Sequence, residues 1–185
     1  ARFRIYLPLT LTVAQALLVR VGVRTYAIPS VMVEQVMELK DEAAGKIRAA
    51  GAAEWLGNRF PYYFLPRLLG DAHSMPEQQR RYSLLLLRAG TQRISVQVDE
   101  LRGNQELVIK NIGPQLARVP GVSGATVLGT GEIVLILNPV QLAQRAGGGV
   151  AVLADVFQER QDRRRHLGER AFIDQRGHAV GGGQF

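Results

Sequence analysis

An all-β fold built from two small barrels is predicted for this chain, and three patterns in the sequence support it. Three pairs of short apolar segments are each joined by a glycine-containing turn, as in β-hairpins. The first two pairs share a short motif, in which an apolar run with Arg20 or Arg88 reaches Gly22 or Gly90 two residues later. Strand and turn patterns also outnumber helical ones along the chain. The shared motif favours two similar barrels.

The first two hairpins are predicted over residues 16–28 and 84–98. The first turns near Gly22, since glycine accepts the positive φ that such turns often need. In the second, apolar and polar residues alternate from Ile94 to Val98, which is the two-residue period of a half-buried strand. The second hairpin therefore presents one apolar face to a core.

The third hairpin is predicted over residues 124–137, with its turn at residues 129–131. Its return strand is apolar on both faces, as expected inside a closed barrel or a sandwich. The pair Gly129 and Gly131 lacks the third glycine and the following helix of a phosphate-binding loop, so a hairpin turn is the better interpretation. We expect Val96, Val134 and Ile136 to be buried.

The remaining segments are less regular. A polar stretch over residues 70–79, punctuated by Gly and Pro, is predicted to be the loop that connects the two halves. An alanine-rich stretch within residues 31–53 favours a helix, although two glycines interrupt it. A short helix over residues 140–146 is predicted to end at the three glycines 147–149. The charged stretch from there to Phe185 is expected to be a linker or a disordered tail.

Composition limits the classes of function. The 185 residues are 46% apolar and 21% charged, with no Cys and no stretch of 18 apolar residues. This composition is typical of a globular domain and excludes a membrane-spanning helix, disulfides and thiol chemistry. The three histidines are scattered, so no zinc-binding spacing occurs. Because the chain begins at Ala1 without a signal peptide, we expect it to be a piece of a longer protein.

The net charge of +7 is dispersed along the chain. Residues 1–24 carry +4, residues 25–54 carry −2, residues 55–93 carry +4, and the rest is almost balanced. Nucleic-acid binders usually gather basic residues on one face, and the one run here, Arg163–Arg165, has acidic neighbours. An arginine-rich β-barrel that binds single-stranded nucleic acid stays open as the alternative, which would need aromatic rings on one basic face.

No catalytic, cofactor-binding or metal-binding set is predicted. Asp99 and Glu100 are adjacent acids at a strand end, and neighbouring strand residues point to opposite faces, so they are poorly placed as an acid–base pair. The serines have no histidine at a suggestive spacing. We therefore expect no enzyme activity and no cofactor in this segment.

Two long motifs stand out: Val-Asp-Glu-Leu-Arg-Gly-Asn-Gln-Glu-Leu-Val-Ile-Lys over residues 98–110, followed by Gly113-Pro114, and the stretch 120–138. Both resemble the C-terminal regulatory domain of the chemotaxis histidine kinase CheA, which is homologous to the adaptor CheW. Residues 17–22 and 26–29 are similar to the first hairpin of that domain. Residues 2–10, with Leu-Pro-Leu-Thr, resemble the last strand of the kinase's ATP-binding domain and the link that leaves it.

Two departures from the family pattern stand out. The family's Arg-Gly segment, followed by Leu-Pro and a Leu-rich helix, is replaced by residues 55–70, which keep only its ending. Asn138 stands where the family commonly has Asp. This pattern is more similar to the kinases of chemosensory systems that control twitching pili than to those of flagellar systems.

The resemblance implies a domain organisation. Residues 1–11 would be the end of the ATP-binding domain and its link, residues 12–146 a CheW-like regulatory domain, and residues 147–185 the linker or tail. Within the regulatory domain it implies two five-stranded SH3-like barrels, which we place at residues 12–70 and 82–140, with strand exchange between them left open.

The resemblance also implies a function in two-component signal transduction. The domain would dock the kinase to CheW-like adaptors and to the cytoplasmic tips of chemoreceptors. It would pass their state to the kinase's own ATP-binding and dimerisation domains through residues 7–10. The segment itself would carry no catalysis, while the parent protein would be a histidine kinase. Its place would be the cytoplasm, in membrane-associated receptor arrays and without inserting into the membrane.

Two groups of residues are the candidate protein contacts. The first is the aromatic cluster Tyr62, Tyr63 and Phe64, of which we expect Tyr62 or Tyr63 to face outward, because neighbouring strand residues alternate; the rings can equally fill a barrel. The second is the segment 98–106, where a solvated strand end is the competing interpretation. Its candidate residues are Val98, Asp99, Glu100, Leu101, Gln105 and Glu106.

Overall fold

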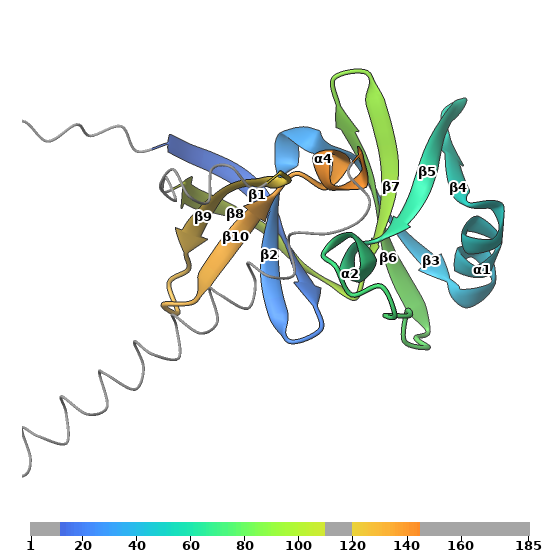
Figure 1. Cartoon of the computed structure of the whole chain (residues 1–185), viewed down its shortest axis with the longest axis horizontal. Helices are drawn as coiled ribbons and strands as arrows, with labels where there is room; N and C mark the ends of the chain where they lie inside the picture. The colour runs from blue at the N-terminus through green and yellow to red at the C-terminus, as the bar shows by residue number, and fades with distance from the viewer. Residues whose placement is uncertain (1–11, 110–119, 145–185) are drawn as a thin grey trace, which may run out of the picture.

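A computed structural model describes residues 12–109 and 120–144. It is mostly β-structure, with ten strands in two five-stranded sheets, each curled into a barrel-like unit (Figure 1). The sheet of barrel A has the strand order β8-β1-β2-β10-β9 and consists of β1 (Thr12–Val21), β2 (Arg24–Pro29), β8 (Glu100–Ile109), β9 (Val122–Val127) and β10 (Ile133–Leu137). The sheet of barrel B has the order β3-β6-β7-β5-β4 and consists of β3 (Val33–Lys40), β4 (Ala52–Trp55), β5 (Asn58–Phe64), β6 (Arg81–Ala89) and β7 (Gln92–Val98). The predicted all-β class with two five-stranded barrels is confirmed.

The three predicted hairpins are present as β1–β2, β6–β7 and β9–β10. Their turns contain Gly22, Gly90 and Gly131, with φ of 58°, 60° and 83°. These values lie in the left-handed region, where a side chain would be strained. Local turn chemistry therefore determines where each hairpin reverses.

The two barrels repeat one topology. Each sheet has a central hairpin, β1–β2 in barrel A and β6–β7 in barrel B. The second strand of this hairpin pairs in parallel with a strand of another hairpin: β2 pairs with β10, and β7 pairs with β5. The outer strands β8 and β3 occupy equivalent positions beside β1 and β6. The shared motif in the sequence falls at matching places, because Arg20 and Arg88 both lie near the end of the first strand of the central hairpin.

Strands are exchanged between the halves of the chain, so the expected division at residues 12–70 and 82–140 does not match the sheets. Barrel B is continuous, from Val33 to Val98, and barrel A is assembled from both sides of it. The loop around residues 70–80 connects α2 (Leu65–Leu68) to β6, both of barrel B, and does not join the two barrels. The chain crosses between barrels at η1 (Ser30–Met32) and at Asp99.

The largest apolar core lies between the barrels. It combines residues of both central hairpins with α2 and with α4 (Pro139–Gln144), a helix that follows β10 but packs against β6, β7 and α2. Its buried members include Leu17, Val19, Tyr26, Ile28, Leu65, Leu69, Leu85, Leu87, Ile94, Val96, Val98, Leu137, Val140 and Leu142. Each sheet therefore buries both of its faces, one toward its own barrel interior and one toward its neighbour.

The helices agree with expectation in part. The alanine-rich stretch forms α1 (Asp41–Ala50), which ends at Gly51 in the left-handed conformation. The strand β3, directly before it, was not predicted. Val96, Val134 and Ile136 are buried, as predicted. The predictions for residues 1–11 and 147–185 lie outside the described residues.

Candidate protein-interaction surface

The aromatic cluster on β5 is largely structural. Phe64 is only 4% exposed. Tyr62 packs against the interior core of barrel B, and its hydroxyl donates to Gln97 Oε1 at 2.9 Å. Tyr63 packs against the core between the barrels. The two tyrosines thus lie on opposite faces of β5, as expected, but both faces are covered and each ring is half-buried.

The segment 98–106 crosses from barrel B to barrel A. Val98 is 1% exposed, so its side chain is not available on the surface, and Leu101 packs against the core between the barrels. Gln105 and Glu106 are exposed on β8. Only the polar members of the predicted segment therefore reach the surface.

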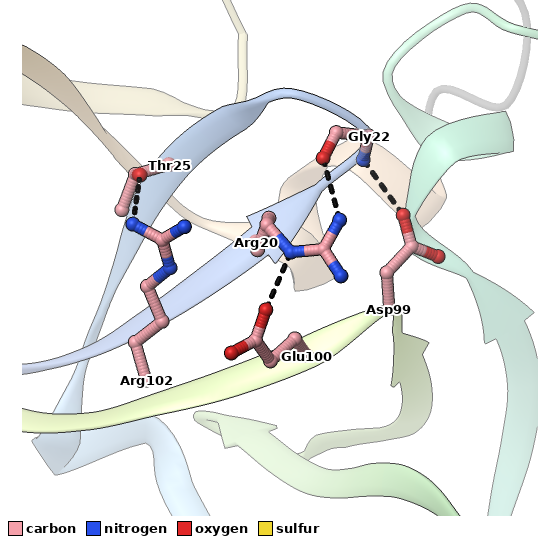
Figure 2. Close-up of polar contacts among 6 residues, drawn as sticks. All are labelled: Arg20, Gly22, Thr25, Asp99, Glu100 and Arg102. Carbon is pink, nitrogen blue, oxygen red and sulfur yellow. Dashed lines mark hydrogen bonds and ion pairs between the residues drawn. The ribbon is translucent and has the colours of Figure 1, made fainter. Parts of the chain in front are cut away.

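Asp99 and Glu100 bind the β1–β2 hairpin at this crossing (Figure 2). The backbone N–H of Gly22 donates to Asp99 Oδ2 at 2.7 Å, and Arg20 Nε donates to Glu100 Oε2 at 2.5 Å. Arg20 Nη1 also donates to the carbonyl of Gly22 at 2.8 Å. The polar contacts thereby tie the start of β8 to the tip of the hairpin. The predicted strand-end acids have intramolecular partners rather than free carboxylates.

The pair of Arg20 and Glu100 shifts the titration of both groups. The hydrogen bond from Arg20 lowers the pKa of Glu100, and the same bond raises the pKa of Arg20. Both side chains are exposed to solvent, so the pair is screened and contributes little to stability.

A second surface follows the outer side of β1 and β8. Leu107 lies in the interior core of barrel A, so the alternating residues Asn104, Glu106 and Val108 point outward. On β1, Val13 lies opposite Val108 and Gln15 lies opposite Glu106. Gln15 Nε2 donates to Glu106 Oε2 at 3.2 Å. We call the outward residues Val13, Gln15, Asn104, Glu106 and Val108 the β1–β8 face. Gln105 belongs to the opposite, inward-pointing set.

The η1 crossing borders this face at its end near barrel B. Ser30 Oγ donates to Asn104 Oδ1 at 2.8 Å, and the next residue, Val31, is 93% exposed. Val13 and Val108 are also exposed large apolar residues. Together with Val31, the face therefore has apolar side chains at both ends and a polar middle. The sequence interpretation missed Val31 and Val13, because a lone valine carries no signal of exposure.

A hollow of ≈ 420 Å³ opens at the junction on the side of the β1–β2 turn. Its apolar lining comes from Val21, Tyr26 and Leu69, and its outer part from residues of that turn and of the loop after α2, among them Val23, Asp71 and Glu77. We call this set the junction hollow. It is open to solvent and combines an apolar floor with acidic side chains and the basic side chain of Arg24.

The described part of the chain offers no metal site, since no group of three His, Asp or Glu residues gathers there. None of its helices is long and apolar enough to cross a membrane. The rings that stacking on a nucleic acid would need, Tyr62, Tyr63 and Phe64, pack against the cores.

The comparisons with known proteins agree with this arrangement. The model of the CheW-like domain family matches residues 15–147. The chain belongs to the CheW-like domain family. The scaffolding protein TtCheW from Thermoanaerobacter tengcongensis has a similar fold, with a TM-score of 0.53 over 69% of this chain and 90% of that protein, at 12% identity.

The curated relatives carry the names of CheA proteins. The chain is 32% identical over 143 residues to the chemotaxis protein CheA of Treponema pallidum, which covers 77% of this chain and 18% of that protein. It is 36% identical over 138 residues to the sensor histidine kinase CheAY of Helicobacter pylori, covering 73% of this chain and 17% of that kinase. The chain thus spans about a fifth of the length of the curated relatives, and the resemblance to the regulatory domain of CheA is confirmed. The comparisons do not distinguish pilus from flagellar systems.

Proposed function

We propose that this chain is the docking domain of a chemosensory histidine kinase. It binds a CheW-like adaptor and the cytoplasmic tip of a receptor, and passes their state to the ATP-binding and dimerisation domains of the same kinase. The domain carries no catalytic step of its own; its output is a change in contacts. It works in the cytoplasm, within receptor arrays at the membrane. The membership in the CheW-like family, the chemotaxis name of one relative and the histidine-kinase name of another support this proposal.

The β1–β8 face with Val31 carries the proposal for the receptor. From Asn104 to Val108 the strand advances about 14 Å, which corresponds to between two and three turns of a helix. A helix with apolar residues at both ends of such a stretch and polar ones between them would match the valines and the pair of Gln15 and Glu106. A receptor tip that is an amphipathic helix would dock here as a helix on a partly apolar surface.

A titration of the chain with the receptor tip and, separately, with the adaptor of the same system tests the proposal. We expect Val31→Asp to weaken receptor binding at least about fivefold, because it places a charge in the desolvated contact. Met75→Glu changes another exposed apolar residue, on the far side of the junction, and should bind the receptor as the wild type does. Normal receptor binding by Val31→Asp would place the contact elsewhere.

The remaining candidate contacts are ranked by the same titrations. Glu106→Ala changes the polar middle of the β1–β8 face, whereas Gln105→Ala changes a neighbour outside it. We expect the first to weaken receptor binding more than the second. For the adaptor, Tyr62→Ala and Tyr63→Ala keep the earlier hypothesis testable, provided that the free energy of unfolding is measured for each, because both rings also pack in cores.

A further inference from the structure

Exposed apolar side chains gather around the junction hollow. Val23, in the β1–β2 turn, is 96% exposed, and Met75, in the loop after α2, is 73% exposed. Both line the hollow, whose floor is also apolar. Two separate loops thus bring exposed apolar side chains to one open site. Such a concentration of apolar surface is typical of an interaction site.

The junction hollow is also acidic. Of the described residues that line it, three are acidic, namely Asp71, Glu77 and Asp99, and one is basic, Arg24, which gives a net charge of −2. Asp99 accepts a hydrogen bond from the backbone N–H of Gly22, whereas the side chains of Asp71 and Glu77 are exposed. A complementary occupant has an apolar stretch with positive charge next to it.

The sequence after α4 has this composition. Residues 150–157 read Val-Ala-Val-Leu-Ala-Asp-Val-Phe, so all but one of them are apolar. Residues 158–165 follow with four arginines and two acids, a net charge of +2. We call residues 150–165 the tail segment. Its apolar part matches the floor and rim of the hollow, and its arginines match the exposed acids.

The tail segment begins within reach of the hollow. α4 ends at Gln144, whose Nε2 donates to Oε1 of Gln92, the first residue of β7. From Gln92 to Asp99, which lines the hollow, the chain advances about 23 Å. The residues from Gln144 to Val150 span about 20 Å when extended. The apolar part of the tail segment can therefore lie across the hollow.

The other end of the chain is less well placed. Residues 1–11 are also apolar and basic, but they join β1 at Thr12. The hollow lies at the opposite end of this strand, beside Val21, about 30 Å away. An extended chain needs about nine residues to bridge that distance, which leaves almost none to fill the hollow.

We propose that residues 150–157 dock in the junction hollow of the same molecule, with the arginines of residues 158–165 beside Asp71 and Glu77. Residues 145–149 form the link. The docked segment covers the exposed apolar rim, so any protein that binds at the hollow must compete with it. The contact uses none of the residues of the β1–β8 face and holds whether or not that face binds a receptor.

Disulfide trapping in the full chain tests the proposal, because the sequence has no Cys. Met75→Cys combined with Leu153→Cys places one thiol at the rim and one in the tail segment. Thr91→Cys combined with Leu153→Cys is the matched control. Thr91 is exposed and precedes Gln92, so it lies nearer to the start of the tail, and a tail without a docking site would reach it at least as readily. Under a mild oxidant, the Met75 pair should form its bond within one molecule at least tenfold faster than the control pair.

Two further variants test whether the apolar part of the tail segment makes the contact. Phe157→Ser, added to the Met75 pair, should slow bond formation at least fivefold. Phe172→Ser removes the same ring outside the tail segment and should leave the rate unchanged. Equal rates for the Met75 and Thr91 pairs, bonds that form mainly between molecules, or equal effects of the two serine variants would each overturn the proposal.

Discussion

In barrel A the outer strands β8 and β9 come close enough for Thr126 Oγ1 to donate to the carbonyl of Val108 at 2.9 Å. In barrel B the corresponding outer strands are β3 and β4, and they are joined by α1, which packs against both. One barrel is thus closed by strand-to-strand contact and the other by a helix. The same topology therefore tolerates two kinds of closure.

The interiors differ accordingly. Barrel A is filled by small and aliphatic side chains, namely Ala16, Leu18, Ala27, Leu107, Val134 and Ile136. Barrel B buries Phe60 and has Trp55 and Tyr62 at its margin. It also admits a cation, since the guanidinium of Arg48, on α1, lies 4.4 Å from the centroid of the Tyr82 ring, and Arg48 Nε donates to Gln97 Oε1 at 3.2 Å. A helical lid leaves space that rings and one long side chain occupy.

The barrels also repeat an ion pair at equivalent places. Arg20 on β1 binds Glu100, the first residue of β8, and Arg88 on β6 binds Glu34, near the start of β3, at 2.9 Å. In both barrels the acid directly follows the crossing from the other barrel. The repeat suggests that each pair aligns the incoming outer strand, which is a small effect on stability but a specific one.

The largest expected effect is in the interior of barrel B. Phe60→Ala removes a fully buried ring from the interior core of barrel B, which has few other large buried residues. The substitution should lower the free energy of unfolding by about 3–5 kcal/mol. Ile136→Ala in barrel A should cost about 2–5 kcal/mol and serves as the comparison. Denaturant unfolding of both measures this. A cost for Phe60→Ala well below that for Ile136→Ala would show that the lid collapses onto the cavity.

The next effect concerns the attachment of α4 to barrel A. Gly121→Ala would place a Cβ 2.2 Å from Leu142 Cδ2, at a φ of 82°. Gly131→Ala has nearly the same φ, 83°, but open space around the new atom, and is the matched control. We expect Gly121→Ala to be more destabilising by about 1–3 kcal/mol, because Leu142 must move. Equal costs, by thermal or denaturant unfolding, would mean that α4 shifts freely.

A smaller effect is expected at alkaline pH. Burial raises the pKa of Tyr62, while the nearby guanidinium groups of Arg48 and Arg67 oppose the shift. The folded state therefore holds this proton after the unfolded state has lost it, so stability falls as pH rises above about 10. Tyr62→Phe should show a shallower loss of unfolding free energy between pH 9 and 11 than the wild type. Parallel curves for the two proteins would contradict it.

The smallest effect belongs to the exposed pair. The pKa of Glu100 is lowered in the folded state, so its contribution is present above the pKa of the unfolded state and disappears as pH falls through the folded value. Glu100→Gln should therefore be slightly less stable than the wild type at pH 7 and converge with it below about pH 4. Thermal unfolding at both pH values measures the difference in stability between the two proteins. A difference that persists in acid would show that it does not arise from the charge of Glu100.

The candidate site could be predicted only in part. The polar residues Asp99, Glu100 and Glu106 are at the surface, as their residue types indicate. Phe64 and Val98 are buried, because each sheet has a core against both of its faces and an apolar residue on either face is covered. No local pattern marks Val31 as exposed, because its exposure depends on where the crossing between the barrels runs.

The sequence by itself determined the hairpins. Alternating apolar residues and glycines at the turns act over a few residues, so the reversals at Gly22, Gly90 and Gly131 follow from local chemistry. Only the tertiary structure decided which sheet each strand joins. The strands β3 and β8 each follow a central hairpin yet pair with the other barrel. That choice depends on burying the faces of both central hairpins in one shared core, which no local pattern encodes.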